Sequence, residues 1–350
     1  MNHEKLDAFL GRMLGELGAA INVPLMLIGD RLGLFRAMHG AGPVTAGELA
    51  QKTGTDERYV KEWLSAMAAG AIVDYDPSSG AFHLPEEHAF ALAVEDSPAN
   101  LQGAFSVISS TYYDWERIAA AYRTGEGVGW HEHHHTLFQG TDRFFRPGYR
   151  ANLVQSWIPS LNGVQDRLAN GAKAADIGCG FGSSTILMAE AYPQSQFFGF
   201  DYHDSSIEAA RREADRAGVS NRVFFDVASA KAFPGENYDF ITVFDCLHDM
   251  GDPVGAAAHI RRALKPDGVF MIVEPFAGDR LEDNLNPVGR MFYSASAMIC
   301  TPGSRAQEVG ACLGAQAGEA RLRAVAEQAG FSRFRRAAQT PFNLIFEAMP

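Results

Sequence analysis

The residues best suited to chemistry stand at the ends of short apolar segments in the second half of the chain. Asp201 ends the run Phe197–Phe200, and His248 follows the run Tyr238–Phe244 by a few residues. An ionised carboxylate only accepts hydrogen bonds, so Asp201 can hold two ribose hydroxyls. Histidine titrates near neutral pH, so His248 can accept a proton. The pattern predicts a site that binds a nucleoside and can move a proton.

A glycine-rich turn must position that nucleoside. The apolar segment Ala174–Ile177 predicts a buried strand, and it is followed by Gly178, Gly180 and Gly182. Ser183–Thr185 offer hydroxyls that could cap a helix over Ile186–Ala191. Glycines belong in such a turn because a side chain would block the ligand or forbid a positive φ. Strand, turn and helix predict the first part of a nucleotide-binding βαβ unit.

The turn lacks the fingerprint of dinucleotide-binding folds. The pattern G-x-G-x-x-G, counted from Gly178, requires a third glycine where this chain has Ser183. A ligand without a pyrophosphate does not need that glycine. The turn therefore argues against a nicotinamide-dependent dehydrogenase.

The pattern D-x-G-x-G-x-G, from Asp176 to Gly182, resembles motif I of the class I S-adenosylmethionine (SAM)-dependent methyltransferases. The turn Leu264–Gly268, which reads LKPDG, also resembles this family, and the similarity extends over residues 172–278. The resemblance implies an α/β fold with a Rossmann-like core of seven strands. It also implies SAM as cofactor, with Asp201 on the ribose and Asp226 on the adenine amino group. The expected cofactor-binding residues are Asp176, Gly178, Gly180, Gly182, Asp201, Tyr202, Asp226, Phe244 and Asp245.

The segment Leu247–Met250 resembles the LHDW segment of small-molecule O-methyltransferases, in which the histidine is the general base. The resemblance therefore assigns that role to His248. Met250 replaces the tryptophan, a departure that concerns the architecture of the acceptor pocket more than the chemistry. Glu274, at the end of a predicted strand, could orient the imidazole or the acceptor. The alternative is a histidine that caps the next helix or lines the pocket.

Aromatic and polar residues between positions 97 and 160, together with residues of an insertion at 275–313, are expected to line the acceptor pocket. The candidates are Tyr113, Trp130, His133, Phe145, Tyr149, Arg290 and Tyr293. The cluster His131–His135 suggests a metal site, but four histidines within five residues of a loop cannot easily face one ion. We therefore expect a polar pocket rim or an exposed loop, and no metal.

Residues 24–95 predict a winged helix: two helices, a third helix over Asp56–Ala69, and a hairpin. This third helix carries three carboxylates against two cations, whereas a helix that reads DNA needs cations. O-methyltransferases that act on small molecules often carry such a module for dimerisation. A regulator that binds SAM or a metabolite without catalysis is the alternative.

Apolar residues recur at helical spacing near the N-terminus and predict an amphipathic helix. The stripe consists of Leu6, Phe9, Leu10, Met13, Leu14 and Leu17. It can pack on the next helix or on a second copy of the chain. We expect both, and hence a homodimer.

The chain of 350 residues has a formal net charge of −12, which disfavours nucleic acid and anionic membranes as partners. No apolar run suggests a transmembrane helix, and the N-terminus does not resemble a signal peptide. The four cysteines show no metal or disulfide spacing. These features predict a cytoplasmic protein with a dimerisation domain at 1–98, a helical linker at 99–165 and a SAM-binding domain at 166–350.

The sequence thus predicts a methyltransferase that moves a methyl group from SAM to a small molecule, most readily to a hydroxyl oxygen. Nitrogen, sulfur and carbon acceptors remain open.

Overall fold

A computed structural model describes all residues from 1 to 350. The chain forms two compact units. The N-terminal unit contains Met1–Ser110 and Gln139–Pro147, and the C-terminal unit contains Thr111–Phe138 and Gly148–Pro350. Two helices, α6 (Gln102–Thr124) and α7 (Thr136–Asn152), contribute residues to both units. The domain boundaries expected after residues 98 and 165 stay a prediction.

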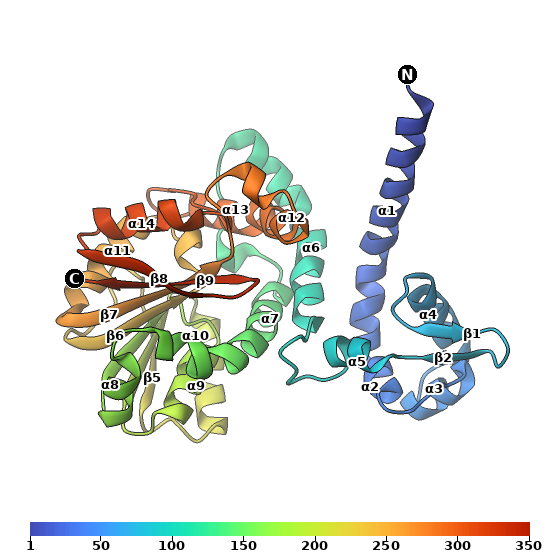
Figure 1. Ribbon diagram of the computed structural model, residues 1–350, viewed down its shortest axis with the longest axis horizontal. Coiled ribbons are helices and arrows are strands. Elements are labelled where there is room, and N and C mark those ends of the chain that lie inside the picture. Colours follow the sequence, from blue (N-terminus) through green and yellow to red (C-terminus); the bar gives the residue numbers. More distant parts are fainter. The chain divides into compact units, whose positions relative to one another are not determined.

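The N-terminal unit is a winged helix, as predicted (Figure 1). Thr45 begins α3 with a reciprocal capping box, in which its hydroxyl accepts from the Glu48 amide and the Glu48 carboxylate accepts from the Thr45 amide. Phe35, Leu64 and Met67 are buried in the core. The elements are α1 (His3–Arg31), α2 (Leu34–Met38), α3 (Ala46–Thr53), α4 (Glu57–Ala69), β1 (Asp74–Asp76), β2 (Ala81–His83) and α5 (Glu86–Leu92).

The first helix is longer than the sequence suggested. Separate helices were expected on either side of Pro24, but α1 continues through Pro24 to Arg31. Proline removes one helical hydrogen bond, and tertiary packing compensates for this loss. Met26 is buried in the core, and the indole N–H of Trp63 donates to the Leu25 carbonyl at 2.9 Å.

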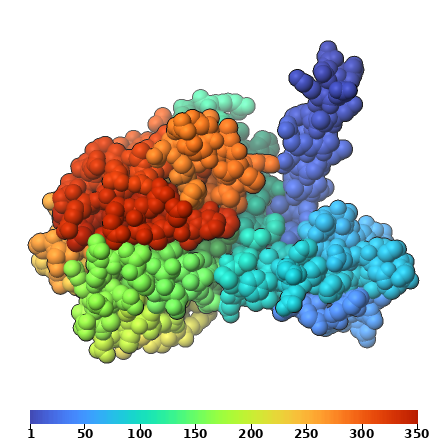
Figure 2. Space-filling view, viewed as in Figure 1, coloured from blue at the N-terminus to red at the C-terminus, as the bar shows by residue number.

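By length and composition alone, α1 is apolar enough to cross a membrane, contrary to the expectation from the sequence. Its most apolar window has a mean hydropathy of 1.2, and 17% of that window is buried. One such helix is weak evidence for a membrane, since core helices and signal sequences meet the same criterion. The first turns of α1 extend beyond the rest of the winged helix (Figure 2).

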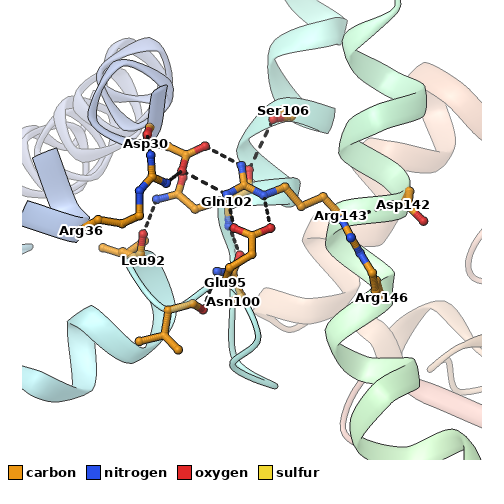
Figure 3. Close-up of polar contacts among 11 residues, drawn as sticks. Asp30, Arg36, Leu92, Glu95, Asn100, Gln102, Ser106, Asp142, Arg143 and Arg146 are labelled. Carbon is orange, nitrogen blue, oxygen red and sulfur yellow. Dashed lines mark hydrogen bonds and ion pairs between the residues drawn. The ribbon is translucent and has the colours of Figure 1, made fainter. Parts of the chain in front are cut away.

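An ion-pair cluster fixes the Gln139–Pro147 part of α7 within the N-terminal unit (Figure 3). The Arg143 guanidinium donates to Glu95 Oε1 at 2.8 Å and to Asp30 Oδ1 at 3.0 Å. These carboxylates, Asp30 above all, raise the pKa of Arg143. Gly140 allows the close approach of the neighbouring helix, because a Cβ there would lie 2.8 Å from Ser106 Cβ.

The C-terminal unit is built on a seven-stranded sheet in the order β5-β4-β3-β6-β7-β9-β8. The first five strands are parallel, and β9 and β8 are antiparallel. The chain order reverses between β3 and β6, which is where open α/β sheets bind ligands. The strands are β3 (Lys173–Ile177), β4 (Gln196–Asp201), β5 (Val223–Val227), β6 (Tyr238–Phe244), β7 (Leu264–Pro275), β8 (Arg333–Gln339) and β9 (Asn343–Met349).

Helices cover both faces of this sheet, with α8 and α9 on one face and α11 and α14 on the other (Figure 1). The strands are buried on both faces, so they read as nearly continuous apolar runs. The principal helices are α8 (Val164–Asn170), α9 (Ser183–Ala191), α10 (Asp204–Arg216), α11 (Pro253–Ala263), α12 (Pro287–Ala295), α13 (Thr301–Arg305) and α14 (Gly318–Gln328). Short helices η1 (Trp130–Glu132), η4 (Leu247–Asp249) and η6 (Ser296–Cys300) lie between them.

Candidate active site

The turn between β3 and α9 has the backbone that its glycines predict. Gly178, Gly180 and Gly182 have φ values of 75°, 53° and 79°, in the left-handed region. A Cβ at Gly178 would lie 2.7 Å from Cys246 Sγ, and one at Gly182 would lie 2.5 Å from Phe225 Cζ. No atom lies within 4 Å of a Cβ placed at Gly180. Gly178 and Gly182 therefore permit close packing, whereas the turn has open space beside Gly180.

Asp176 fixes this turn to the sheet. Its Oδ2 accepts from Ser184 Oγ at 2.6 Å and from Thr185 Oγ1 at 2.7 Å. The two hydroxyls were expected to cap α9, but they donate to Asp176, and Gly182 occupies the N-cap position. Asp176 is fully buried, and burial raises its pKa. Its hydrogen bonds therefore go to the turn itself, and its expected part in cofactor binding stays a prediction.

Asp201, at the carboxyl end of β4, faces the same turn. Its Oδ2 accepts from the Gly180 amide at 3.0 Å, and its Oδ1 accepts from the His203 amide at 2.9 Å. Each oxygen keeps a second lone pair, which suits the two hydroxyls of a ribose. Tyr202 is partly exposed beside it, and Asp226 at the end of β5 is exposed and pairs with Arg211 at 3.2 Å. The predicted ribose and adenine carboxylates thus lie on adjacent strands.

The end of β6 brings Phe244 and Asp245 to this edge of the sheet. Asp245 Oδ2 accepts from Tyr149 Oη at 3.0 Å, and Oδ1 accepts from Asn343 Nδ2 at 3.1 Å. Burial and the nearby Glu274 carboxylate raise the pKa of Asp245 to about 8. Its φ is +49°, a conformation that is strained for a residue with a side chain. The sequence analysis assigned Tyr149 to the acceptor pocket and missed Asn343.

His248 lies in η4, just beyond β6, between two carboxylates. Its Nδ1 contacts Glu274 Oε2, and its Nε2 lies 3.0 Å from Asp249 Oδ1. Burial opposes the positive charge, but Asp249 and Glu274 outweigh it and raise the pKa of His248 well above its usual range. Both carboxylates thus favour the charged form of this imidazole. The sequence analysis missed Asp249, although it directly follows the histidine.

Glu274 orients this histidine from β7. Its Oε1 accepts from the Leu247 amide at 2.9 Å and from the His248 amide at 3.3 Å, so the carboxylate fixes both the backbone and the ring. Glu274 is almost fully buried. The sequence suggested this role as one of two alternatives.

Comparisons with known proteins agree with this geometry. Residues 168–330 match the family described as a methyltransferase domain, and residues 19–94 match the Rv2258c-like winged HTH domain. The chain therefore contains a methyltransferase domain that follows a winged-helix domain.

Individual relatives show how far the similarity extends. A sterol 24-C-methyltransferase from Aspergillus fumigatus is 26% identical over 73% of this chain and 61% of its own length. An acetylserotonin O-methyltransferase from Mus musculus molossinus is 24% identical over 93% of the chain and 84% of its own length. The structure of human N-acetylserotonin methyltransferase in complex with SAM has a TM-score of 0.71, with 17% identity over 97% of each chain. The chain spans less than two thirds of the length of the sterol 24-C-methyltransferase, so only part of that relative is matched.

The predicted pocket residues of the methyltransferase are spread over several elements. Tyr113 on α6 stacks on His134 with ring centroids 4.0 Å apart, and Trp130 in η1 lies 5.4 Å from Phe138. Arg290 and Tyr293 lie on α12. Phe145 belongs to the N-terminal unit, where its ring lies 5.0 Å from that of Phe144.

Tyr293 lines a cavity of about 580 Å³ in the C-terminal unit. The end of α6, the α12–α13 segment and the loop Cys312–Gln316 form its walls. None of the predicted cofactor-binding residues lines it, and Tyr293 is its one predicted pocket residue. We assign the cofactor site from the glycine turn and the strand ends, where the chemical groups converge.

The histidine cluster does not converge on one point. His133 is buried, His134 is half-buried, and His131 and His135 are exposed. Donor atoms of His248, Asp249 and Cys300 lie within 4.8 Å of one another. A closed tetrahedral zinc site uses four ligands, and two of these three groups already form an ion pair. The expected absence of a metal stays a prediction.

Proposed function

We propose that this methyltransferase transfers a methyl group from SAM to a hydroxyl oxygen of a small molecule, with His248 as the base. The observation that carries the proposal is the pair of carboxylates around His248 at the end of β6. Such a histidine is useful when the acceptor must lose a proton. The similarity to acetylserotonin O-methyltransferase over 93% of the chain also supports an oxygen acceptor. The sterol C-methyltransferase relative makes carbon the rival acceptor.

The residues of the chain divide the work as follows. SAM supplies an electrophilic methyl group on a positively charged sulfur. The Gly178–Gly182 turn and Asp201 hold the nucleoside. The hydrogen-bonded pair of Asp245 and Tyr149 bounds the cofactor site. The acceptor oxygen displaces the sulfur in line, so the carbon–oxygen bond forms as the carbon–sulfur bond breaks and its electron pair stays on sulfur. His248 Nε2 loses its own proton to solvent as the pH rises, and it then takes the acceptor proton while Glu274 holds Nδ1.

The test is a transfer assay with methyl-labelled SAM and a metabolite extract, followed by identification of the labelled product. We expect a labelled methyl ether, and less label with Asp201→Ala at a SAM concentration that just saturates the wild type. A product labelled on carbon would move the enzyme to the rival class. Binding of S-adenosylhomocysteine without any labelled product would favour a non-catalytic regulator.

We further propose that the methyltransferase is a homodimer held by its N-terminal unit. On α1, Leu14 is 69% exposed, Leu17 is 62% exposed and Ile21 is 77% exposed. A continuous apolar stripe of this kind marks an interaction surface. Burial of this stripe against a second copy would also explain why α1 is apolar enough to cross a membrane by length and composition.

The double variant Leu14→Glu/Leu17→Glu should be monomeric by light scattering at micromolar concentration, because four glutamates would face one another across the dimer contact. The matched control is Leu281→Glu, which adds charge at an exposed leucine of the C-terminal unit and should remain dimeric. A monomeric wild type would refute the proposal, and sedimentation with lipid vesicles would instead assign α1 to a membrane.

A cytoplasmic location is also proposed. All four cysteines are free thiols, which agrees with a reducing compartment. Nucleic acid is not proposed as a partner, because on α4 the Arg58 guanidinium already pairs with Glu62.

A further inference from the structure

A second buried histidine is paired with a carboxylate and has no part in the proposed mechanism. His133 Nδ1 lies 3.0 Å from Asp114 Oδ2, and the side chains are 2% and 7% exposed. Asp114, on α6, also accepts from the His134 amide at 3.1 Å. The carboxylate therefore fixes both the ring of His133 and the backbone that follows it.

The other ring nitrogen of His133 has no partner. Nε2 is buried and makes no hydrogen bond within the chain. A carboxylate oxygen accepts, so Nδ1 carries the hydrogen of the pair and Nε2 is left to present a lone pair. Buried polar atoms are almost always hydrogen-bonded, so a buried acceptor of this kind calls for a donor from outside the chain.

The segment that carries His133 runs between two parts of the active site. At one end, the Val128 amide donates to the Pro302 carbonyl at 3.0 Å, close to Cys300, whose thiol lies beside His248. Gly127 permits this approach, because a Cβ there would lie 1.9 Å from the Ala306 amide nitrogen. This end therefore contacts the segment that follows Cys300.

At the other end, the segment reaches the cofactor carboxylate. The Phe138 ring lies 4.7 Å from the His203 ring, and the His203 amide donates to Asp201. Residues 127–138 thus extend from a contact with the segment that follows Cys300 to a contact with the ring of His203, and His133 lies between these two contacts along the chain. The acceptor must also lie between the base and the cofactor.

We propose that His133 Nε2 binds the methyl acceptor by accepting a hydrogen bond from a second donor group on it. This inference rests on the proposed function, and it narrows the acceptor to small molecules with at least two O–H or N–H donors. One donor is the hydroxyl that is methylated near His248, and the other is held by His133. The rings of Tyr113 and His134 stack on each other next to the His133–Asp114 pair. A planar acceptor would pack against these rings with its second donor at His133.

Kinetics of His133→Phe with the acceptor found in the labelling assay test this role. The KM for the acceptor should rise about 10- to 100-fold, because the buried donor of the acceptor would lose its partner. The affinity for SAM and the kcat at saturating acceptor should change less than about threefold. His39→Gln, at an exposed histidine of the N-terminal unit, is the matched control and should leave the KM unchanged. An unchanged KM in His133→Phe, or a fall in kcat alone, would overturn the proposal.

Asp114 is a positioning residue, so its variant needs a separate readout. Asp114→Ala should raise the KM in the same direction, because the ring of His133 then loses the acceptor that holds its hydrogen on Nδ1. His133→Phe leaves the Asp114 carboxylate without its partner, and this variant could fail to fold for that reason. The double variant Asp114→Leu/His133→Phe removes both polar groups and then takes the place of His133→Phe in the assay.

An acceptor analogue tests the second donor directly. With that donor capped by a methyl group, the analogue should have a KM about 10- to 100-fold higher than the acceptor in the wild type. In His133→Phe the two compounds should have similar KM values. An acceptor with a single donor group, or a discrimination that survives in His133→Phe, would overturn the proposal.

A measurement without any acceptor separates this proposal from the proposed function. In ¹⁵N NMR spectra of the protein with S-adenosylhomocysteine, the His133 ring should carry its hydrogen on Nδ1 in the wild type and should lose that preference in Asp114→Ala. An Nε2–H form in the wild type would overturn the role of His133, whatever the labelling assay shows. A failed labelling assay with the expected spectra would instead count against hydroxyl methylation.

Discussion

Replacing His248 with alanine is expected to reduce turnover about 10²–10⁴-fold, the usual contribution of a positioned acid–base group. The affinity for SAM should change little, because the imidazole contacts Glu274 and Asp249 and makes no contact with the glycine turn. Initial rates with the identified acceptor and calorimetry with S-adenosylhomocysteine measure the two quantities. Near-normal turnover would show that another group accepts the proton or that the acceptor ionises unaided.

The same base should give turnover an unusual pH dependence. Glu274 and Asp249 raise the pKa of His248, and a base must first lose its proton. Turnover should therefore rise with pH through neutrality and into the alkaline range, and should fall as pH decreases. The other ionisable groups around His248 are Asp245 and Cys300, both with a raised pKa.

The variant Asp249→Asn tests whether the titration of His248 produces this pH dependence of turnover. It removes one negative charge from beside Nε2, so the pKa of His248 should fall and the rise in turnover should move to lower pH. The matched control is Asp252→Asn, which changes a carboxylate that caps α11 and pairs with Lys231. A profile that does not move in Asp249→Asn would contradict the assignment of His248 as the base.

Replacing Asp201 with alanine is the second large expected effect, a weakening of SAM binding by roughly 1.5–3 kcal/mol. The carboxylate is expected to hold the ribose, and it also accepts from the Gly180 and His203 amides. The variant therefore loses the ligand contact and loosens the turn. Calorimetry with SAM and with S-adenosylhomocysteine measures the change.

Asp226→Ala is the matched control for this experiment. Its carboxylate is 64% exposed and pairs with Arg211, so its removal should weaken binding less than Asp201→Ala. An unchanged affinity in Asp201→Ala would refute the assignment of the ribose site. Tight binding of NADH to the wild type would instead support a dehydrogenase.

The sequence predicted the elements of the cofactor site well, because local rules decide them. The glycines at positions 178, 180 and 182 require a turn with positive φ, and apolar runs before each acid require buried strands. In a parallel sheet the carboxyl ends of such strands lie at one edge. The order of the motifs along the chain was therefore enough to bring Asp201, Asp226 and Asp245 to one edge of the sheet.

Local rules failed where a distant partner changed the outcome. Pro24 predicted a break in the first helix, but the bond from Trp63 to the Leu25 carbonyl, across 38 positions, holds the helix together beyond it. Ser184 and Thr185 predicted helix caps, but the buried Asp176 takes both hydroxyls. The hydroxyls of Ser184 and Thr185 can bond either to the start of α9 or to Asp176. Because Asp176 is buried, the second arrangement is the one that leaves no buried carboxylate unpaired.

The sequence alone determined the fold class, the cofactor-binding turn and the histidine most suited to be a base. The tertiary structure alone decided the protonation chemistry around that histidine. Glu274 reaches His248 across 26 positions, Asn343 reaches Asp245 across 98, and Asp114 reaches His133 across 19. No residue pattern encodes these distances, because the charge on a buried group depends on which other groups the packing places within a few ångströms of it.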